Sequence, residues 1–177
     1  MSKKVLRGAI QKVATGPEFS KNISVEDSYN SMLSILDNDA DPVQAAIYLI
    51  AMRMKRETMD ENIGSLKALI DKSNIITADV DELLDIAEPY NGFLRNTPLS
   101  AFLPAVFASI GIPCITHGVK TVGPKFGLTT KRILETAGIN VEQNSQEASV
   151  CLENKDIGWA YLDQGEFCKP LYDLVDL

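Results

Sequence analysis

The chain has little of what histidine-based catalysis, disulfide frameworks and membrane insertion require. Its 177 residues include one histidine, His117, and three cysteines, Cys114, Cys151 and Cys168, with no paired spacing. A histidine-based catalytic triad therefore has little support, and the cysteines are typical of reduced thiols in a cytoplasmic protein. No apolar run approaches the roughly 18 residues that a membrane-spanning helix needs. The amphipathic opening segment lacks signal-peptide features, so we interpret it as the first helix of the mature protein.

Positive charge is also scarce relative to negative charge. The 24 acidic and 17 basic residues give a formal net charge of −7, which argues against a protein held to nucleic acid mainly through phosphate contacts. Nucleic acid stays an alternative partner only through a local basic patch, whose candidates are Lys120, Lys125, Lys131 and Arg132. Apolar residues make up 45% of the chain, enough for one domain or for a domain joined to a smaller helical piece.

Helical periodicity, with start and stop signals, runs through the first 75 residues. Apolar residues three and four apart predict a first helix that stops at Gly16-Pro17. Three residues with N-cap character begin further helices: Ser24, Asp41 and Thr58. The third helix, residues 43–55, is apolar nearly all round, so we expect it to be buried on most sides. Four short helices joined by tight turns predict a small bundle.

After Ile75, short apolar strands alternate with helices. We expect strands within residues 82–89, 112–116, 139–143 and 157–163, and helices at 98–111, 128–138, 145–155 and from 167 onward. This alternation predicts βαβ units and a largely parallel sheet. The fold class is therefore α/β, with a small N-terminal helical bundle over residues 1–76 and an incomplete, mostly parallel α/β domain over residues 77–177.

Two loops that follow strands carry candidate ligand-binding residues. In the first loop, Asn91-Gly92 favours a tight turn and Arg95 precedes a helix, where a cation and free N–H groups would attract a phosphate. The second loop begins at His117 and Gly118, where an apolar strand turns polar. It continues through two lysines, Lys120 and Lys125. Either both loops form one anion-binding crevice at the same sheet edge, or they are ordinary solvated turns.

Two other groups of residues also have both functional and ordinary explanations. The acidic run over residues 79–85 is either a solvated face or a contact for Mg²⁺. Trp159 and Tyr161 alternate along an expected strand, so they are either core residues or a stacking platform for nucleic acid.

Several motifs along nearly the whole chain resemble the anthranilate phosphoribosyltransferase family, which has the glycosyltransferase family 3 fold. The turn over residues 55–61, KRETMDE, is similar to that family's KGET-x-EE turn. GIPCITHGVK, residues 111–120, resembles its G-V-x-V-x-K-H-G-N-R, and ILETAGINV, residues 133–141, resembles its VLEALGVNL. The resemblance implies a nucleoside phosphorylase-like α/β fold behind a helical domain.

The chain departs from the family pattern at the residues that would bind the donor. Where the family has its G-T-G-G-D loop, residues 87–92 read AEPYNG, so backbone N–H groups are less free to surround a pyrophosphate. Of the family's N-x-S-T motif only the serine remains, at Ser100. In K-H-G-N-R the first lysine is replaced by Thr116 and the final arginine by Lys120, which loses a bidentate fork.

The resemblance implies a cytoplasmic, magnesium-dependent transferase of tryptophan biosynthesis, which moves a phosphoribosyl group from phosphoribosyl pyrophosphate to an aromatic amine. The implied ligand-binding set is Asn91, Gly92, Arg95, Ser100, His117, Gly118, Lys120 and Lys125. The Mg²⁺ ligands would lie outside this chain, which corresponds to the N-terminal half of a family member, and the N-terminal helices would form a homodimer. Because the donor motif is eroded, the alternative is a non-catalytic scaffold for a nucleotide or nucleic acid.

Overall fold

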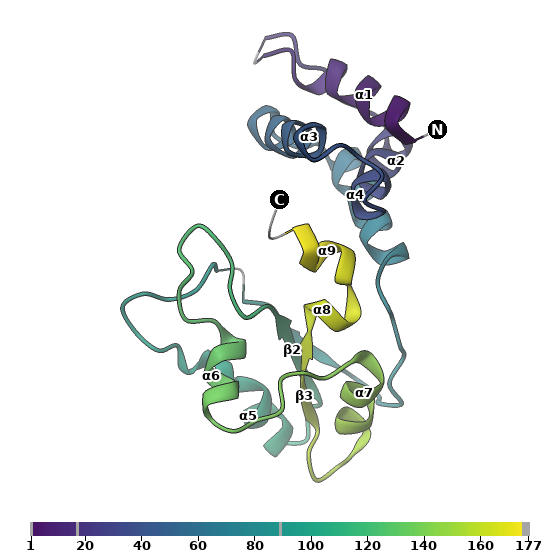
Figure 1. Ribbon diagram of the computed structural model, residues 1–177. Coiled ribbons are helices and arrows are strands. Elements are labelled where there is room, and N and C mark those ends of the chain that lie inside the picture. Colours follow the sequence, from purple (N-terminus) through teal and green to yellow (C-terminus); the bar gives the residue numbers. More distant parts are fainter. Residues whose placement is uncertain (1, 17, 89, 175–177) are drawn as a thin grey trace. The chain divides into compact units, whose positions relative to one another are not determined.

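The computed structural model describes residues 2–16, 18–88 and 90–174, which form two compact units that divide between Ser73 and Asn74 (Figure 1). We call them the helical unit and the α/β unit and describe each by itself. In the described parts of the chain, no helix is long and apolar enough to cross a membrane.

The helical unit contains the four expected helices. They are α1 (Ser2–Val13), α2 (Val25–Leu36), α3 (Pro42–Lys55) and α4 (Met59–Asp71). The three expected N-caps are present: Ser24 and Asp41 accept backbone N–H bonds, and Thr58 forms a reciprocal capping box with Glu61. Helix α2 packs against α4, and α1 packs against both α2 and α3. The stop signal at Pro17 lies outside the described residues.

The expectation that the third helix is buried on most sides is wrong. Only Ala45, Tyr48 and Met52 of α3 are buried. Val43, Ile47, Ile50 and Met54 form an exposed stripe along the same helix. The physical reason is that α1 covers one side of α3 in a bundle of four short helices, so an apolar composition does not guarantee a neighbour on every face.

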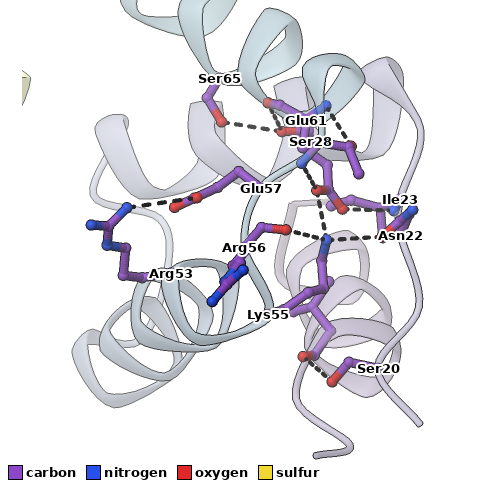
Figure 2. Close-up of polar contacts among 12 residues, drawn as sticks. Ser20, Asn22, Ile23, Ser28, Arg53, Lys55, Arg56, Glu57, Glu61 and Ser65 are labelled. Carbon is purple, nitrogen blue, oxygen red and sulfur yellow. Dashed lines mark hydrogen bonds and ion pairs between the residues drawn. The ribbon is translucent and has the colours of Figure 1, made fainter. Parts of the chain in front are cut away.

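A buried ion pair joins the α3–α4 turn to the segment before α2 (Figure 2). Lys55 Nζ lies 2.7 Å from Glu61 Oε2, and the two side chains are 6% and 0% exposed. Glu61 also accepts backbone N–H bonds from Ile23 at 2.9 Å and Thr58 at 2.7 Å. Burial alone would raise the pKa of Glu61, but the Lys55 ammonium and these backbone donors outweigh it and lower that pKa.

The α/β unit is built on three parallel strands in the order β1-β2-β3. They are β1 (Leu84–Ile86), β2 (Cys114–Gly118) and β3 (Trp159–Asp163). The connections contain η1 (Leu99–Phe102), α5 (Leu103–Ser109), α6 (Thr130–Thr136) and α7 (Ser145–Glu153), and two short helices follow β3, α8 (Gln164–Phe167) and α9 (Lys169–Asp173). The α/β fold class is therefore confirmed.

Side chains on alternate faces of β3 enter two separate cores. Tyr161 packs with residues of η1 and α6, whereas Ala160 packs with Ala148 and Leu152 of α7. Helices thus cover both faces of the sheet, with α5 and α6 on one side and α7 on the other (Figure 1). Successive side chains of a strand point to opposite faces of the sheet, so both sets are buried when helices cover both faces.

The strand expected at residues 139–143 is absent, although all five residues lie in the described chain. Asn140 Oδ1 instead accepts the backbone N–H of Glu142 at 3.1 Å, a local turn that competes with strand pairing. Val141 is buried in the core with Leu134 and Tyr161. The apolar residues of this segment therefore reflect core packing by a loop.

Candidate functional site

A cavity of about 440 Å³ opens at the carboxyl ends of the parallel strands of the α/β unit. Its walls come from the loop after β1, the end of β2, the start of α6 and the end of β3. The lining residues are Ala87, Glu88, Tyr90, Asn91, Gly92, Phe93, His117, Gly118, Val119, Val122, Leu128, Thr129, Thr130, Lys131, Tyr161 and Gln164. This edge is where open α/β sheets bind ligands.

The two loops singled out from the sequence meet at one wall of this cavity. Phe93 and Leu128 form an antiparallel bridge with N–H···O distances of 2.9 Å in both directions. Next to it, the backbones of Gly92 and Gly127 are in contact, and a Cβ on Gly92 would lie 2.3 Å from the Gly127 carbonyl carbon. Gly92 also has φ +91, so both its conformation and its contact require glycine.

His117 and Gly118 lie where the strand β2 reaches the cavity. His117 Nε2 is 3.4 Å from Asp85 Oδ1 on the neighbouring strand β1. The edge of the imidazole faces the Phe167 ring, with centroids 5.7 Å apart. The single histidine is therefore oriented by a carboxylate and an aromatic ring while its side chain stays 34% exposed.

Ser100 is bonded to a carboxylate that itself lines the cavity. Its hydroxyl donates to Glu88 Oε2 at 3.0 Å, and both residues are half-buried. Glu88 lies in the loop that follows β1. The Ser100 hydroxyl is thus occupied by an internal carboxylate.

Three predicted cationic residues lie outside the cavity wall. Arg95 is exposed, and it is not among the lining residues. Lys120 Nζ pairs with Glu135 Oε1 at 3.0 Å, with its side chain 54% exposed. Lys125 is exposed as well. The structure brings Asn91, Gly92, His117 and Gly118 together and leaves these cations at the surface.

Two residues that line the cavity, Lys131 and Tyr161, are not in the ligand-binding set that the resemblance implies. Lys131 Nζ lies 2.9 Å from Glu142 Oε1 and 3.0 Å from Asp163 Oδ2, with its side chain only 6% exposed. Burial alone would lower the pKa of Lys131, but these carboxylates outweigh it and raise that pKa. Tyr161, the second residue, is 1% exposed. Its position inside the expected strand, two residues before the aspartate that ends it, was the available signal.

The burial of Lys131 bears on the basic patch considered for nucleic acid. Lys131 faces inward and is neutralised, and Lys120 is paired with Glu135. Two of the four cations in that patch are therefore already engaged by carboxylates.

Three residues of the acidic run over residues 79–85 line a different cavity. Asp79, Asp81 and Glu82 line a space of about 640 Å³ beside residues that precede the strands, at the opposite sheet edge. Within the described parts of the chain, no group of three or more His, Cys, Asp or Glu side chains could hold a metal ion.

The chain thus has the architecture of a helical bundle followed by a parallel α/β sheet, with a cavity at the carboxyl ends of the strands. Residues 7–73 match the family described as "Glycosyl transferase family, helical bundle domain". In fold, the chain is similar to anthranilate phosphoribosyltransferase from Thermus thermophilus, with a TM-score of 0.77 and 19% identity over 97% of this chain and 49% of that one. The enzyme from Saccharomyces cerevisiae in complex with PRPP and Mg gives a TM-score of 0.74 at 16% identity, over 98% of this chain and 50% of that one.

Sequence relatives lead to the same family. The chain is 27% identical over 157 residues to anthranilate phosphoribosyltransferase of Acetivibrio thermocellus, covering 89% of this chain and 44% of the relative. It is 28% identical over 158 residues to the same enzyme of Pelotomaculum thermopropionicum, with the same coverage, 89% and 44%. The resemblance to the anthranilate phosphoribosyltransferase family is therefore confirmed in sequence and fold, and the chain spans about half the length of these relatives.

Proposed function

We propose that this chain is a diverged anthranilate phosphoribosyltransferase-like protein whose cavity binds a phosphate-bearing sugar such as phosphoribosyl pyrophosphate. The observation that carries the proposal is the meeting of Asn91, Gly92, His117 and Gly118 around one cavity at the carboxyl ends of β1 and β2. A volume of about 440 Å³ lies within the usual range for small-molecule sites.

The activity to test is transfer of the phosphoribosyl group to an aromatic amine. In such a reaction this chain would contribute by holding donor and acceptor in line and by excluding water. Gly92 and Gly118 leave backbone N–H groups approachable, and His117, held beside Asp85, offers a ring nitrogen to the ligand. We assign Mg²⁺, which the family resemblance implies, to no described residue of this chain, because these residues contain no group of three or more His, Cys, Asp or Glu side chains that could hold a metal ion.

Two features support a changed activity over ordinary phosphoribosyl transfer to an aromatic amine. Glu88 places a carboxylate on Ser100, where a pyrophosphate would otherwise meet a hydroxyl donor. Arg95, Lys120 and Lys125 do not line the cavity, so little positive charge is available to offset the donor's negative charge. Binding without turnover, as in a non-catalytic nucleotide-binding scaffold, would follow from the same geometry.

The experiment is a transferase assay run beside a binding assay. The purified chain is mixed with phosphoribosyl pyrophosphate, Mg²⁺ and a panel of aromatic amines, and pyrophosphate release is measured. Release above the amine-free background supports transfer. Saturable binding without release supports the non-catalytic alternative, and absence of both contradicts the proposed function.

We further propose that the α3 stripe pairs with a second copy of this chain. Four apolar side chains spaced along one face, Val43, Ile47, Ile50 and Met54, are exposed in the described helical unit. A groove lined partly by Ile47, Ile50 and Met54 continues from them. Sedimentation should give a dimer, and Ile50→Glu should give a monomer with unchanged helix content. A wild-type monomer at micromolar concentration would contradict this.

The proposed location is the cytoplasm. Cys114, Cys151 and Cys168 are all free thiols in the structure, as a reducing compartment would allow. Maleimide labelling of the chain in intact and lysed cells would test the location.

A further inference from the structure

The cavity floor contains a buried hydroxyl group without a partner. Tyr161 is 1% exposed, and its hydroxyl has no hydrogen-bond partner among the residues that the structure describes. The same side chain lines the cavity. Buried hydroxyls are almost always bonded, because leaving one unpaired forfeits its bonds to water. An unpaired hydroxyl on a residue that lines a cavity therefore points to a ligand in that cavity.

The tyrosine ring is fixed independently of that hydroxyl. It packs in the core of the α/β unit with Ala101, Leu134 and Val141. The hydroxyl thus keeps a constant position without any bond of its own. Its place in the cavity is set by the apolar packing of β3 against η1 and α6.

Gly118 places no side chain beside the hydroxyl. A Cβ at residue 118 would lie 3.4 Å from Tyr161 Oη, at ordinary contact distance. Any side chain there would cover the hydroxyl from the direction of β2. The glycine that ends β2 therefore adds no side chain to the atoms that already bury this donor.

The charges around Tyr161 define what the hydroxyl can bind. Burial, with Asp163 and Glu142 nearby, raises the pKa of Tyr161, so the group is a neutral donor at physiological pH. The two carboxylates already share Lys131, and the three side chains together carry a net charge of −1. An anionic oxygen would be repelled at this point, whereas an uncharged oxygen would accept the bond freely.

We propose that Tyr161 is a ligand-binding residue whose hydroxyl donates to an uncharged sugar oxygen of the bound ligand. The proposal rests on the proposed function, since it assigns the sugar of the phosphate-bearing ligand to the cavity floor. The phosphate groups would then lie away from Tyr161, nearer the mouth of the cavity.

Tyr161→Phe tests the assignment, because it removes only the hydroxyl and keeps the ring in its core. The probes are ribose 5-phosphate and inorganic pyrophosphate, titrated calorimetrically into the wild type, into Tyr161→Phe and into a control, Tyr172→Phe. Tyr172 is exposed and does not line the cavity. We expect Tyr161→Phe to weaken the affinity for ribose 5-phosphate about ten-fold and to leave the affinity for pyrophosphate unchanged. The urea unfolding midpoint should stay the same or rise. The control should match the wild type.

The outcomes separate this inference from the function on which it rests. If the wild type and Tyr161→Phe bind ribose 5-phosphate with equal affinity, the inference alone is overturned. That result would mean that an ordered water satisfies the hydroxyl. Equal losses for both probes overturn the sugar assignment. A wild type that binds no sugar phosphate overturns the proposed function and this inference with it.

Discussion

Replacing Lys55 with methionine removes the cation from the buried ion pair of the helical unit while keeping an unbranched side chain of similar length. Lys55 Nζ contacts Glu61 Oε2 at 2.7 Å, Asn22 Oδ1 at 3.0 Å and the Arg56 carbonyl at 3.3 Å (Figure 2). The substitution leaves the fully buried Glu61 carboxylate without its counter-ion.

The size of the effect follows from what remains around Glu61. Removing one partner of a buried ion pair typically costs about 3–5 kcal/mol. Two backbone N–H donors, from Ile23 and Thr58, still bond the carboxylate. We therefore expect the lower end of that range, about 3 kcal/mol. With a urea m-value of about 1–3 kcal/mol/M, the unfolding midpoint falls by roughly 1 M or more.

Urea unfolding followed by circular dichroism in the far ultraviolet measures this change. The matched control is Lys12→Met, because Lys12 also pairs with a carboxylate in the same unit, Asp27 at 2.8 Å, but its side chain is 50% exposed. An exposed pair contributes about 1 kcal/mol or less. If Lys55→Met costs no more than Lys12→Met, the reasoning about the buried pair is wrong.

Three further predictions concern the same turn and the cavity wall. Because the pKa of Glu61 is lowered in the fold, its contribution is present above its unfolded pKa of about 4.3 and is lost as the pH falls through the lower folded value. The stability difference between wild type and Glu61→Gln should therefore shrink in urea titrations below about pH 4, and a constant difference would contradict this. Arg56 has φ +67, so Arg56→Gly should raise the free energy of unfolding by about 1 kcal/mol, and a loss of stability would refute strain at this residue. Gly92→Ala should clash with the Gly127 backbone and speed hydrogen exchange at the Phe93 and Leu128 amides, and unchanged protection there would show that the two loops move apart freely.

The sequence predicts the four N-terminal helices, and the alternation of strands and helices after them, because local signals determine them. The capping residues Ser24, Asp41 and Thr58 begin their helices as expected. The segment around Val141 was predicted as a strand and is a loop, since apolar residues that fill a core look the same in either state. Whether a neighbour covers the apolar stripe of α3 depends on packing, which periodicity does not contain.

The candidate site was predictable only in part for a similar reason. Strand ends and glycines led to Asn91, Gly92, His117 and Gly118, which the structure places around one cavity. Charge, loop position and, for Lys120, the family resemblance suggested Lys120 and Lys125, but a lysine side chain is long and the sequence does not say where its ammonium group lies. Lys131 is the opposite case, since a residue assigned to a surface patch has two carboxylate partners and a buried side chain.

The central claim is that the cavity beside His117 binds a phosphate-bearing sugar. Calorimetric titration of phosphoribosyl pyrophosphate, with and without Mg²⁺, tests it most directly when the wild type is compared with His117→Ala and Lys125→Ala. Lys125 is exposed and does not line the cavity. We expect saturable binding that His117→Ala weakens and Lys125→Ala leaves unchanged. A folded wild-type chain that shows no saturable binding in either condition would contradict it.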